Sequence, residues 1–242
     1  MTATRSPAVP LSRLRLRFAG GVALGALGLA ALWRPLGTAW VLAATLPGAY
    51  LAAYAWTNLG ANHSPDGADP SSRLGPANAI TLFRGWLAAV LAGAAVAPPP
   101  DPRIPVALFV GAVGLDAVDG AVARRTRETV LGARLDGATD ALAVLVGAAV
   151  AVALGALPAW YLLAGGVWYA YAGSLWRRRR AGAPVYELPP SRLRPFVGTA
   201  QFVVVAIALL PAVGTAGEIT GLTALAGVAL AALLASFARD WA

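Results

Sequence analysis

The chain has 242 residues, of which 58% are hydrophobic and only 12% are charged, and its mean hydropathy is +0.67. These values exclude an ordinary soluble globular protein and indicate a polytopic membrane protein. All 19 basic residues are arginine, and the formal net charge is +8. A basic chain can bind nucleic acid, but these arginines lie at the ends of apolar runs, which positive-inside topology explains without a nucleic-acid partner. Cysteine is absent, which excludes disulfides and thiolate metal ligands.

Residues 1–57 predict a basic N-terminus followed by a transmembrane hairpin. One apolar run covers 18–33 and a second covers 38–57, with a turn at Arg34 and Pro35. The second run argues against a cleaved signal peptide, which would need only the first. Residues 58–77 are rich in Asn, Ser, Pro, Asp and Gly, which is typical of a loop. We predict a polar linker there.

Six further apolar runs follow, each close to the roughly 17 to 25 residues that a membrane-spanning helix needs. They cover residues 79–97, 105–123, 137–157, 159–176, 197–213 and 219–238. The runs are continuous rather than alternating, which favours helices over strands. The predicted fold class is therefore all-α: a polytopic transmembrane helical bundle with a six-span core over residues 78–242 and two N-terminal spans.

With eight spans, every connection between them can be assigned to one face of the membrane or the other. Only Arg34 and Arg103 of the 19 arginines fall on the far side, and the remaining 17 lie on the side of both termini. Arginine-rich connections stay in the cytoplasm. We therefore expect an integral protein of the cell membrane with both termini in the cytoplasm.

Four aspartates lie where the fourth span ends and the fifth begins: Asp116, Asp119, Asp136 and Asp140. Residues three or four apart are neighbours on a helix, so the first two share one helix face and the last two share another. At about 5 Å and an effective dielectric of about 20, each pair of carboxylates repels by roughly 3 kcal/mol. Positive charge must therefore lie among them, and Mg²⁺ or Mn²⁺, often completed by substrate phosphates, suits such oxygen ligands. A site at this edge would face the cytoplasm and meet both nucleotides and lipid.

The aspartates belong to a longer pattern: DxxDGxxAR, then seven residues, then GxxxDxxxD. Its specified positions are Asp116, Asp119, Gly120, Ala123, Arg124, Gly132, Asp136 and Asp140. This pattern resembles the signature of the CDP-alcohol phosphotransferase (CDP-alcohol phosphatidyltransferase) family, membrane enzymes that make phospholipid head groups. Upstream, Asn78, Thr81 and Arg84 resemble the family's NxxTxxR, so the resemblance covers about residues 76–240. The family usually has about eight residues where this chain has seven, a difference that falls in a turn and is tolerable there.

The resemblance implies a transferase of substituted phosphate groups, of the EC 2.7.8 type, in phospholipid biosynthesis. Such an enzyme moves a phosphatidyl-type group from a CDP-linked lipid, CDP-diacylglycerol or CDP-archaeol, to a small hydroxyl acceptor and releases CMP. The resemblance further implies two Mg²⁺ or Mn²⁺ ions held by Asp116, Asp119 and Asp136. Asp140 would be a further ligand or the general base on the acceptor hydroxyl. A homodimer is also implied.

The other motif residues are candidates for nucleotide or substrate binding. Gly120 and Gly132 would let a nucleotide approach the backbone, although Gly132 could equally be a simple turn glycine. Arg124 offers a planar fork for phosphate oxygens, or a positive-inside anchor. Arg84, a charge inside a span, needs a partner, which is either the aspartate cluster or phosphate. Ala123, Asn78 and Thr81 complete this group of candidates.

The acceptor is left open. Arg192 and Arg194 follow a Pro-rich loop and could bind an anionic acceptor such as glycerol phosphate or inositol phosphate. Membrane orientation and attraction to anionic lipid would explain the same arginines. Branches of the family that use those acceptors often carry Lys or Arg directly after the fourth aspartate, where this chain has Ala141.

Two other functions fit part of the pattern. Intramembrane prenyltransferases also bind diphosphates through aspartate motifs and Mg²⁺, but they usually place the two motifs far apart in the chain. A divalent-cation transporter would be expected to carry its charges near the bilayer midplane and in repeated halves. Release of CMP or of inorganic diphosphate, and metal flux without nucleotide, distinguish the three functions.

Overall fold

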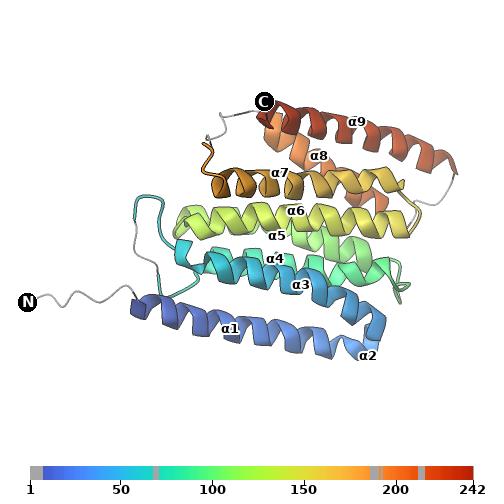
Figure 1. Cartoon of the computed structure of the whole chain (residues 1–242). Helices are drawn as coiled ribbons and strands as arrows, with labels where there is room; N and C mark the ends of the chain where they lie inside the picture. The colour runs from blue at the N-terminus through green and yellow to red at the C-terminus, as the bar shows by residue number, and fades with distance from the viewer. Residues whose placement is uncertain (1–7, 68–70, 186–190, 192, 212–215, 242) are drawn as a thin grey trace, which may run out of the picture.

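The computed structural model describes residues 8–67, 71–185, 191, 193–211 and 216–241, and within these ranges every regular element is a helix. Figure 1 shows the long helices lying roughly side by side. They are α1 (Ala8–Ala31), α3 (Thr38–Asn58), α4 (Pro76–Leu91), α5 (Ile104–Arg125), α6 (Val130–Ala153), α7 (Leu162–Arg180), α8 (Leu193–Ala208) and α9 (Ala216–Trp241). Short turns of helix join some of them: α2 (Trp33–Leu36), η1 (Leu59–Ala61), η2 (Ala92–Ala95) and η3 (Ala159–Tyr161). The predicted all-α bundle is confirmed.

Five of the described helices are long and apolar enough to cross a membrane: α1, α4 with η2, α5, α6 and α9. α8 is apolar but has only 16 residues. α3 contains Pro47, and α7 ends in four consecutive arginines. The protein is therefore membrane-embedded and polytopic, and the count of eight spans stays a prediction.

α6 begins earlier than the apolar run over 137–157 predicts. Its first residue is Val130, because the hydroxyl of Thr129 accepts a hydrogen bond of 2.9 Å from the backbone N–H of Gly132 and so caps the helix. The polar residues of the first turns do not register as part of an apolar run. As a result, the second aspartate pair lies within α6 rather than at its start.

α6 is also the central helix of the bundle. It lies in the middle of Figure 1, contacts α3, α4, α5, α7 and α8, and is buried along most of its length. Glycine permits the closest of these approaches, because a methyl group added at Gly165 of α7 would overlap the backbone of Leu145 in α6. Small residues commonly allow such close packing between membrane helices.

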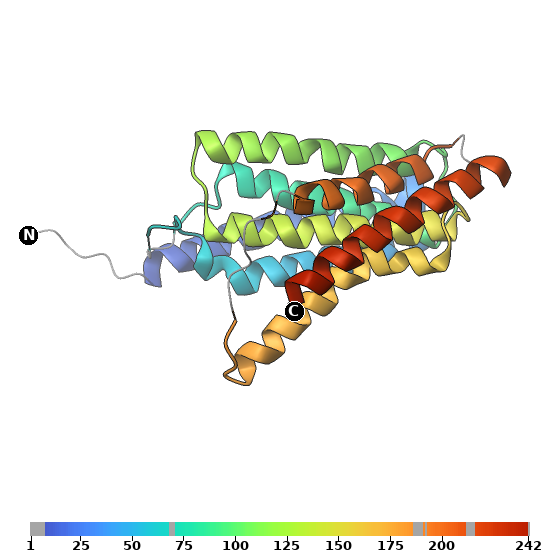
Figure 2. The same ribbon diagram turned by 90° about the horizontal axis from the view of Figure 1, so that it is seen from above.

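The C-terminal helices are joined by a buried polar bridge. Figure 2 shows α9 crossing the bundle obliquely, while the end of α7 extends away from the other helices. The hydroxyl of Tyr161 donates to Oε1 of Gln201 at 2.8 Å, and Nε2 of Gln201 donates to the carbonyl of Ala229 at 2.9 Å. These polar groups thus find partners inside the protein, as groups buried in a membrane must.

We expect Gly165→Ala to destabilise the protein, because the new methyl group would overlap a backbone that cannot rotate away. Overpacking of this kind typically costs about 1–3 kcal/mol, so the thermal unfolding midpoint in detergent should fall by several degrees. Gly166→Ala is the matched control, since nothing lies within 4 Å of its added methyl group. Equal midpoints for the two variants would contradict the close contact between α6 and α7.

Candidate active site

The four aspartates of the sequence pattern converge between α4, α5 and α6. Asp116 and Asp119 lie one turn apart on α5, and Asp136 and Asp140 lie one turn apart on α6. A short turn over residues 126–129 joins the two helices and brings the pairs together. The spacing in the sequence predicted this sharing of helix faces.

Arg84 of α4 lies at the centre of the four carboxylates. Its Nη1 is 2.8 Å from Oδ2 of Asp119 and 3.1 Å from Oδ1 of Asp136. Its Nη2 is 2.9 Å from Oδ1 of Asp116 and 2.6 Å from Oδ1 of Asp140. The Arg84 side chain is only 2% exposed. A single buried cation therefore pairs with all four acids.

The rest of the arginine head group is also held by the protein. Nε of Arg84 donates to the carbonyl of Ala112 at 3.0 Å, so all three guanidinium nitrogens meet protein oxygen atoms. One turn earlier on α4, the hydroxyl of Thr81 donates to Oδ2 of Asp119 at 2.8 Å. Of the two partners that the sequence left open for Arg84, the structure provides the aspartates. Contact of Thr81 or Arg84 with substrate stays a prediction.

Arg84 offsets only part of the negative charge at the site. Four ionised carboxylates and one guanidinium leave a formal charge of −3. Each pair of carboxylates about 5 Å apart repels by roughly 3 kcal/mol at an effective dielectric of about 20. Further positive charge would therefore stabilise this arrangement.

Three of the aspartates are arranged to bind a metal ion. One carboxylate oxygen from each of Asp116, Asp136 and Asp140 lies within 4.8 Å of the others. Their side chains are 49%, 49% and 34% exposed, so a ligand can reach them. Carboxylate oxygens are the ligands that Mg²⁺ and Mn²⁺ prefer. The residues present therefore fit a divalent cation.

Asp119 differs from the other three aspartates. Its side chain is only 7% exposed, and its Oδ2 accepts hydrogen bonds from both Thr81 and Arg84. Asp119 is not part of the group whose oxygens lie within 4.8 Å of one another. Its contacts are those of an anchor for Arg84, whereas the resemblance implies direct metal ligation by Asp119, and the metal affinity of Asp119→Asn distinguishes the two roles.

A cavity of about 780 Å³ opens beside the aspartates, with Asp116 and Asp140 in its wall. Most of its lining is apolar and comes from α5 and α8: Phe109, Val110, Val113, Phe202, Val203 and Ala206. Ser191 and Arg194 line it as well. A cavity with carboxylates in one part and apolar walls elsewhere suits a ligand that has a charged part and an apolar part.

The glycines of the pattern lie in different surroundings. Gly120 is open, since an added methyl group would meet only Nη1 of Arg124, at 3.3 Å. Arg124 is exposed and Ala123 is partly buried. Gly132 is enclosed, because an added methyl group would lie 2.7 Å from Oδ1 of Asn78. Packing alone explains the glycine at 132, and its contact with a nucleotide stays a prediction.

The remaining predicted site residues, Asn78, Arg192 and Arg194, also differ in their surroundings. Asn78 is buried, and its amide nitrogen donates to Leu74, Asn62 and Thr129 within the protein. Arg194 is partly buried and lines the cavity, whereas Arg192 lies outside the described residues. Sequence reasoning missed Ser191 and the apolar lining, because apolar residues of a span carry no sign of whether they face lipid or a cavity.

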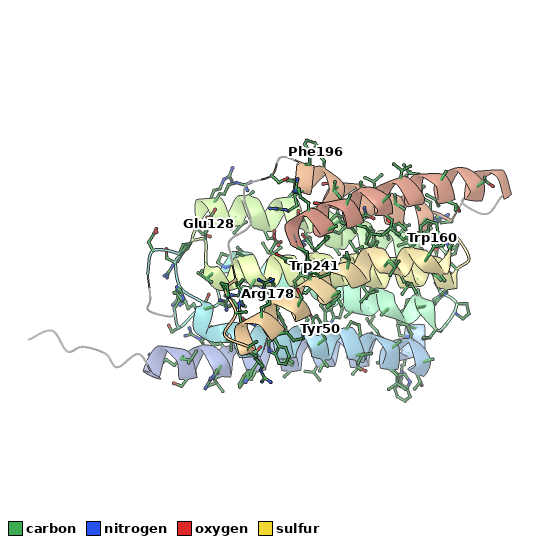
Figure 3. The ribbon with its side chains drawn as sticks, turned by 45° about the horizontal axis from the view of Figure 1, so that its top comes forward. Tyr50, Glu128, Trp160, Arg178, Phe196 and Trp241 are labelled. Carbon is green, nitrogen blue, oxygen red and sulfur yellow. The ribbon has the colours of Figure 1, made fainter. Side chains whose placement is uncertain are left out.

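The site lies near the turn over residues 126–129, since Asp119 and Asp136 are each seven residues from it along the chain. Figure 3 shows Glu128, in the turn between α5 and α6, toward the same end as Arg178 of α7, with Trp160 toward the opposite end. Ionisable residues inside a membrane-embedded bundle are rare and usually serve a function. The cluster of charges beside a partly apolar cavity therefore indicates a membrane protein with a functional polar site.

A sequence model of the CDP-alcohol phosphatidyltransferase family matches residues 75–236, which is most of the chain. The protein therefore belongs to this family, as the aspartate pattern predicted. No curated protein and no solved structure matches the chain. The family transfers a phosphatidyl group from a CDP-alcohol to an alcohol acceptor within the membrane, generally with a divalent metal, so the protein is a membrane transferase.

The Mn²⁺ affinities of single Asp→Asn variants are expected to distinguish the accessible aspartates from Asp119. Asp116→Asn and Asp136→Asn each remove an accessible carboxylate and should weaken Mn²⁺ binding by more than about 100-fold, whereas Asp119→Asn should weaken it about tenfold, as outer partners of a metal site do. Titration of the purified protein with Mn²⁺, followed by electron paramagnetic resonance, measures the affinities.

Asp101→Asn is the matched control, because it removes the same charge from an exposed residue between η2 and α5. Its Mn²⁺ affinity should equal that of the wild type. A loss in Asp119→Asn as large as in Asp136→Asn would instead make Asp119 a direct ligand, as the resemblance implies.

Proposed function

We propose that the protein transfers the phosphatidyl-type group of a CDP-linked lipid, CDP-diacylglycerol or CDP-archaeol, to a small hydroxyl acceptor and releases CMP, as a step of phospholipid biosynthesis. The observation that carries this proposal is that Asp116 and Asp140 belong both to the acidic cluster and to the wall of the cavity. The diphosphate of such a donor would lie at the carboxylates and its lipid part against the apolar walls. Family membership supports the same reaction class.

The aspartates are proposed to hold two Mg²⁺ or Mn²⁺ ions, with Asp116, Asp136 and Asp140 as the accessible ligands and Asp119 behind them. Such ions, when bound, neutralise diphosphate oxygens and stabilise the charge that develops on the leaving CMP. The charge of the site supports two ions. The array carries −3, so two divalent ions and a diphosphate of about −2 give about −1, whereas one ion would leave about −3.

Asp140 is the proposed general base. The acceptor hydroxyl attacks the phosphorus on the lipid side of the diphosphate, a new P–O bond forms, and the bond from that phosphorus to the CMP oxygen breaks with its electron pair. Asp140 takes the hydroxyl proton. Its side chain is 34% exposed in the cavity wall and is oriented by Arg84 at 2.6 Å, so a hydroxyl bound in the cavity would come within hydrogen-bond reach.

The nucleotide is proposed to lie along α5 beyond the first aspartate pair. Gly120 is open there, Ala123 follows it by one turn, and Arg124 presents an exposed guanidinium to phosphate oxygens. Arg84 is proposed to hold the four carboxylates in place rather than to bind the substrate itself, since each of its guanidinium nitrogens already meets a protein oxygen.

The acceptor is proposed to carry a phosphate, as glycerol phosphate and inositol phosphate do. Arg194 and Ser191 line the same cavity as Asp140, so they could bind that phosphate while the hydroxyl meets the base. Charge-assisted hydrogen bonds from arginine suit this task.

The active site and both termini are proposed to face the cytoplasm of the cell. In the predicted eight-span topology, only Arg34 and Arg103 of the 19 arginines fall on the far side, and Figure 3 shows Glu128, in the turn that joins α5 and α6, toward the same end as Arg178. That placement would give the site access to soluble nucleotides and acceptors and, at the same time, to lipid. A homodimer is proposed from the family resemblance alone.

The central experiment measures CMP release by the purified protein in detergent with Mg²⁺ or Mn²⁺, CDP-diacylglycerol or CDP-archaeol, and a panel of acceptors. We expect CMP release that needs metal and one acceptor, and that falls by at least about 100-fold in Asp140→Asn, because a base typically contributes about 10²–10⁴-fold. Asp101→Asn should keep wild-type activity. Release of inorganic diphosphate instead of CMP, or metal flux in proteoliposomes without nucleotide, would contradict the proposed reaction.

Arg194→Ala is expected to raise the KM of a phosphorylated acceptor by roughly 10- to 100-fold and to leave the KM of the CDP-linked donor unchanged, because a hydrogen bond to a charged group contributes about 1.5–3 kcal/mol. Steady-state kinetics with each substrate varied in turn provide the measurement. Arg178→Ala, an exposed arginine of α7 that does not line the cavity, is the control. An unchanged acceptor KM in Arg194→Ala would refute the assignment.

A further inference from the structure

The part of the chain before the family match contacts the helix that carries the second aspartate pair. We use the term N-terminal segment for residues 8–67 and 71–74, which contain α1, α2, α3 and η1. Leu131 and Leu135, on the first two turns of α6, are fully buried. They form one hydrophobic cluster with Leu14 and Phe18 of α1 and with Leu59 of η1. One side of α6 at the active site is therefore covered by the N-terminal segment.

Two polar contacts connect the same elements. The backbone N–H of Val130, the first residue of α6, donates to the carbonyl of His63 at 3.0 Å. An N–H at a helix start has no partner within its own helix, so the loop after η1 supplies one. Nη1 of Arg134, one turn further on, donates to Oδ1 of Asn58 at the end of α3, at 2.9 Å.

A buried network adds a third connection, through α4. Asn62 is fully buried, and its Nδ2 donates to the carbonyl of Arg73 at 2.8 Å, which folds the loop back on itself. Its Oδ1 accepts a hydrogen bond of 3.2 Å from Nδ2 of Asn78. Nδ2 of Asn78 also donates to Oγ1 of Thr129, the residue that caps α6, at 3.1 Å. Gly132 leaves room for the Asn78 side chain in this network.

These contacts fix the first turns of a helix that also carries site residues. Asp136 lies seven residues after Thr129 within the same unbroken helix, so a displacement at the start of α6 would carry its carboxylate with it. Groups that bind metals or act in catalysis must be held within about 0.5 Å of their working positions. The positions of the Asp136 and Asp140 carboxylates therefore depend on contacts made about two and about three turns away, respectively.

We propose that the N-terminal segment is a positioning element of the active site: Asn58 and Asn62, acting through α6, hold Asp136 and Asp140 where they bind metal. Asn78 is a member of the same network, and this explains its place in the sequence pattern without a contact to substrate. The inference rests on the proposed role of the aspartates as metal ligands. It assigns a role to the two N-terminal helices, which precede the residues that match the family.

The test uses full-length Asn58→Ala and Asn62→Ala, with Thr45→Ala as the matched control. Thr45 is an exposed polar residue of α3, and its hydroxyl donates to the carbonyl of Leu42 in its own helix. Mn²⁺ affinity of the purified protein is measured without substrate. We expect it to fall about tenfold in both asparagine variants, as for outer partners of a metal site, and to be unchanged in Thr45→Ala.

A second readout reports on α6 directly. The chain has no cysteine, so Ala133→Cys, at an exposed position in the first turn of α6, takes a single spin label. The label should become more mobile when Asn58→Ala or Asn62→Ala is added and should stay as it was with Thr45→Ala. Asn58→Ala keeps the test valid if Asn62→Ala does not fold, because Asn58 is only partly buried.

Wild-type Mn²⁺ affinity in folded Asn58→Ala would overturn the proposal. A lower unfolding temperature with unchanged Mn²⁺ affinity and unchanged label mobility would overturn it too, because that is the result expected of a purely structural role. Weaker Mn²⁺ binding together with a higher Mn²⁺ requirement for CMP release would support it. Failure of the wild type to release CMP would count against the proposed reaction alone, since the metal-binding measurement needs no substrate.

Discussion

The packing of four carboxylates around Arg84 is the constraint on which the rest of the structure depends. Charges so close together repel strongly wherever water is partly excluded, so α4 must bring a cation into their midst. Arginine suits this position better than lysine would, because its planar head offers donors in several fixed directions. Here Nη1 pairs with Asp119 and Asp136, while Nη2 pairs with Asp116 and Asp140.

This arrangement explains why the core is built around α4, α5 and α6. α4 packs closely on both of its neighbours, and α6 is buried along most of its length. Asp136 and Asp140 therefore project from a helix that neighbouring elements hold on several sides, and Asp116 and Asp119 project from α5, which packs mainly on α4. None of the four acids lies in a loop. Sites on such elements keep their geometry more accurately than sites on loops. The apolar cavity then lies where α8 approaches α5 beside the exposed acids.

Much of this could be predicted from the sequence, because apolar run length and aspartate spacing follow directly from helix geometry. The start of α6 could not, since it depends on the cap at Thr129, which a count of apolar residues ignores. The surroundings of Asn78 were equally hidden, because its partner Asn62 lies 16 residues upstream and outside the pattern. Whether Phe202 faces lipid or the cavity depends on how α8 packs on α5, which no local pattern encodes.

The four aspartates also show why a residue pattern alone does not determine roles. Asp119 points toward α4, where Thr81 and Arg84 use its Oδ2, and its side chain is 7% exposed. Asp116, one turn away on the same helix, is 49% exposed and lines the cavity. Both positions call for a short side chain that is negatively charged and pairs with Arg84, but one is enclosed beside α4 and the other also lines the cavity. The same residue type therefore occupies two different surroundings, and only the packing of α4 against α5 tells them apart.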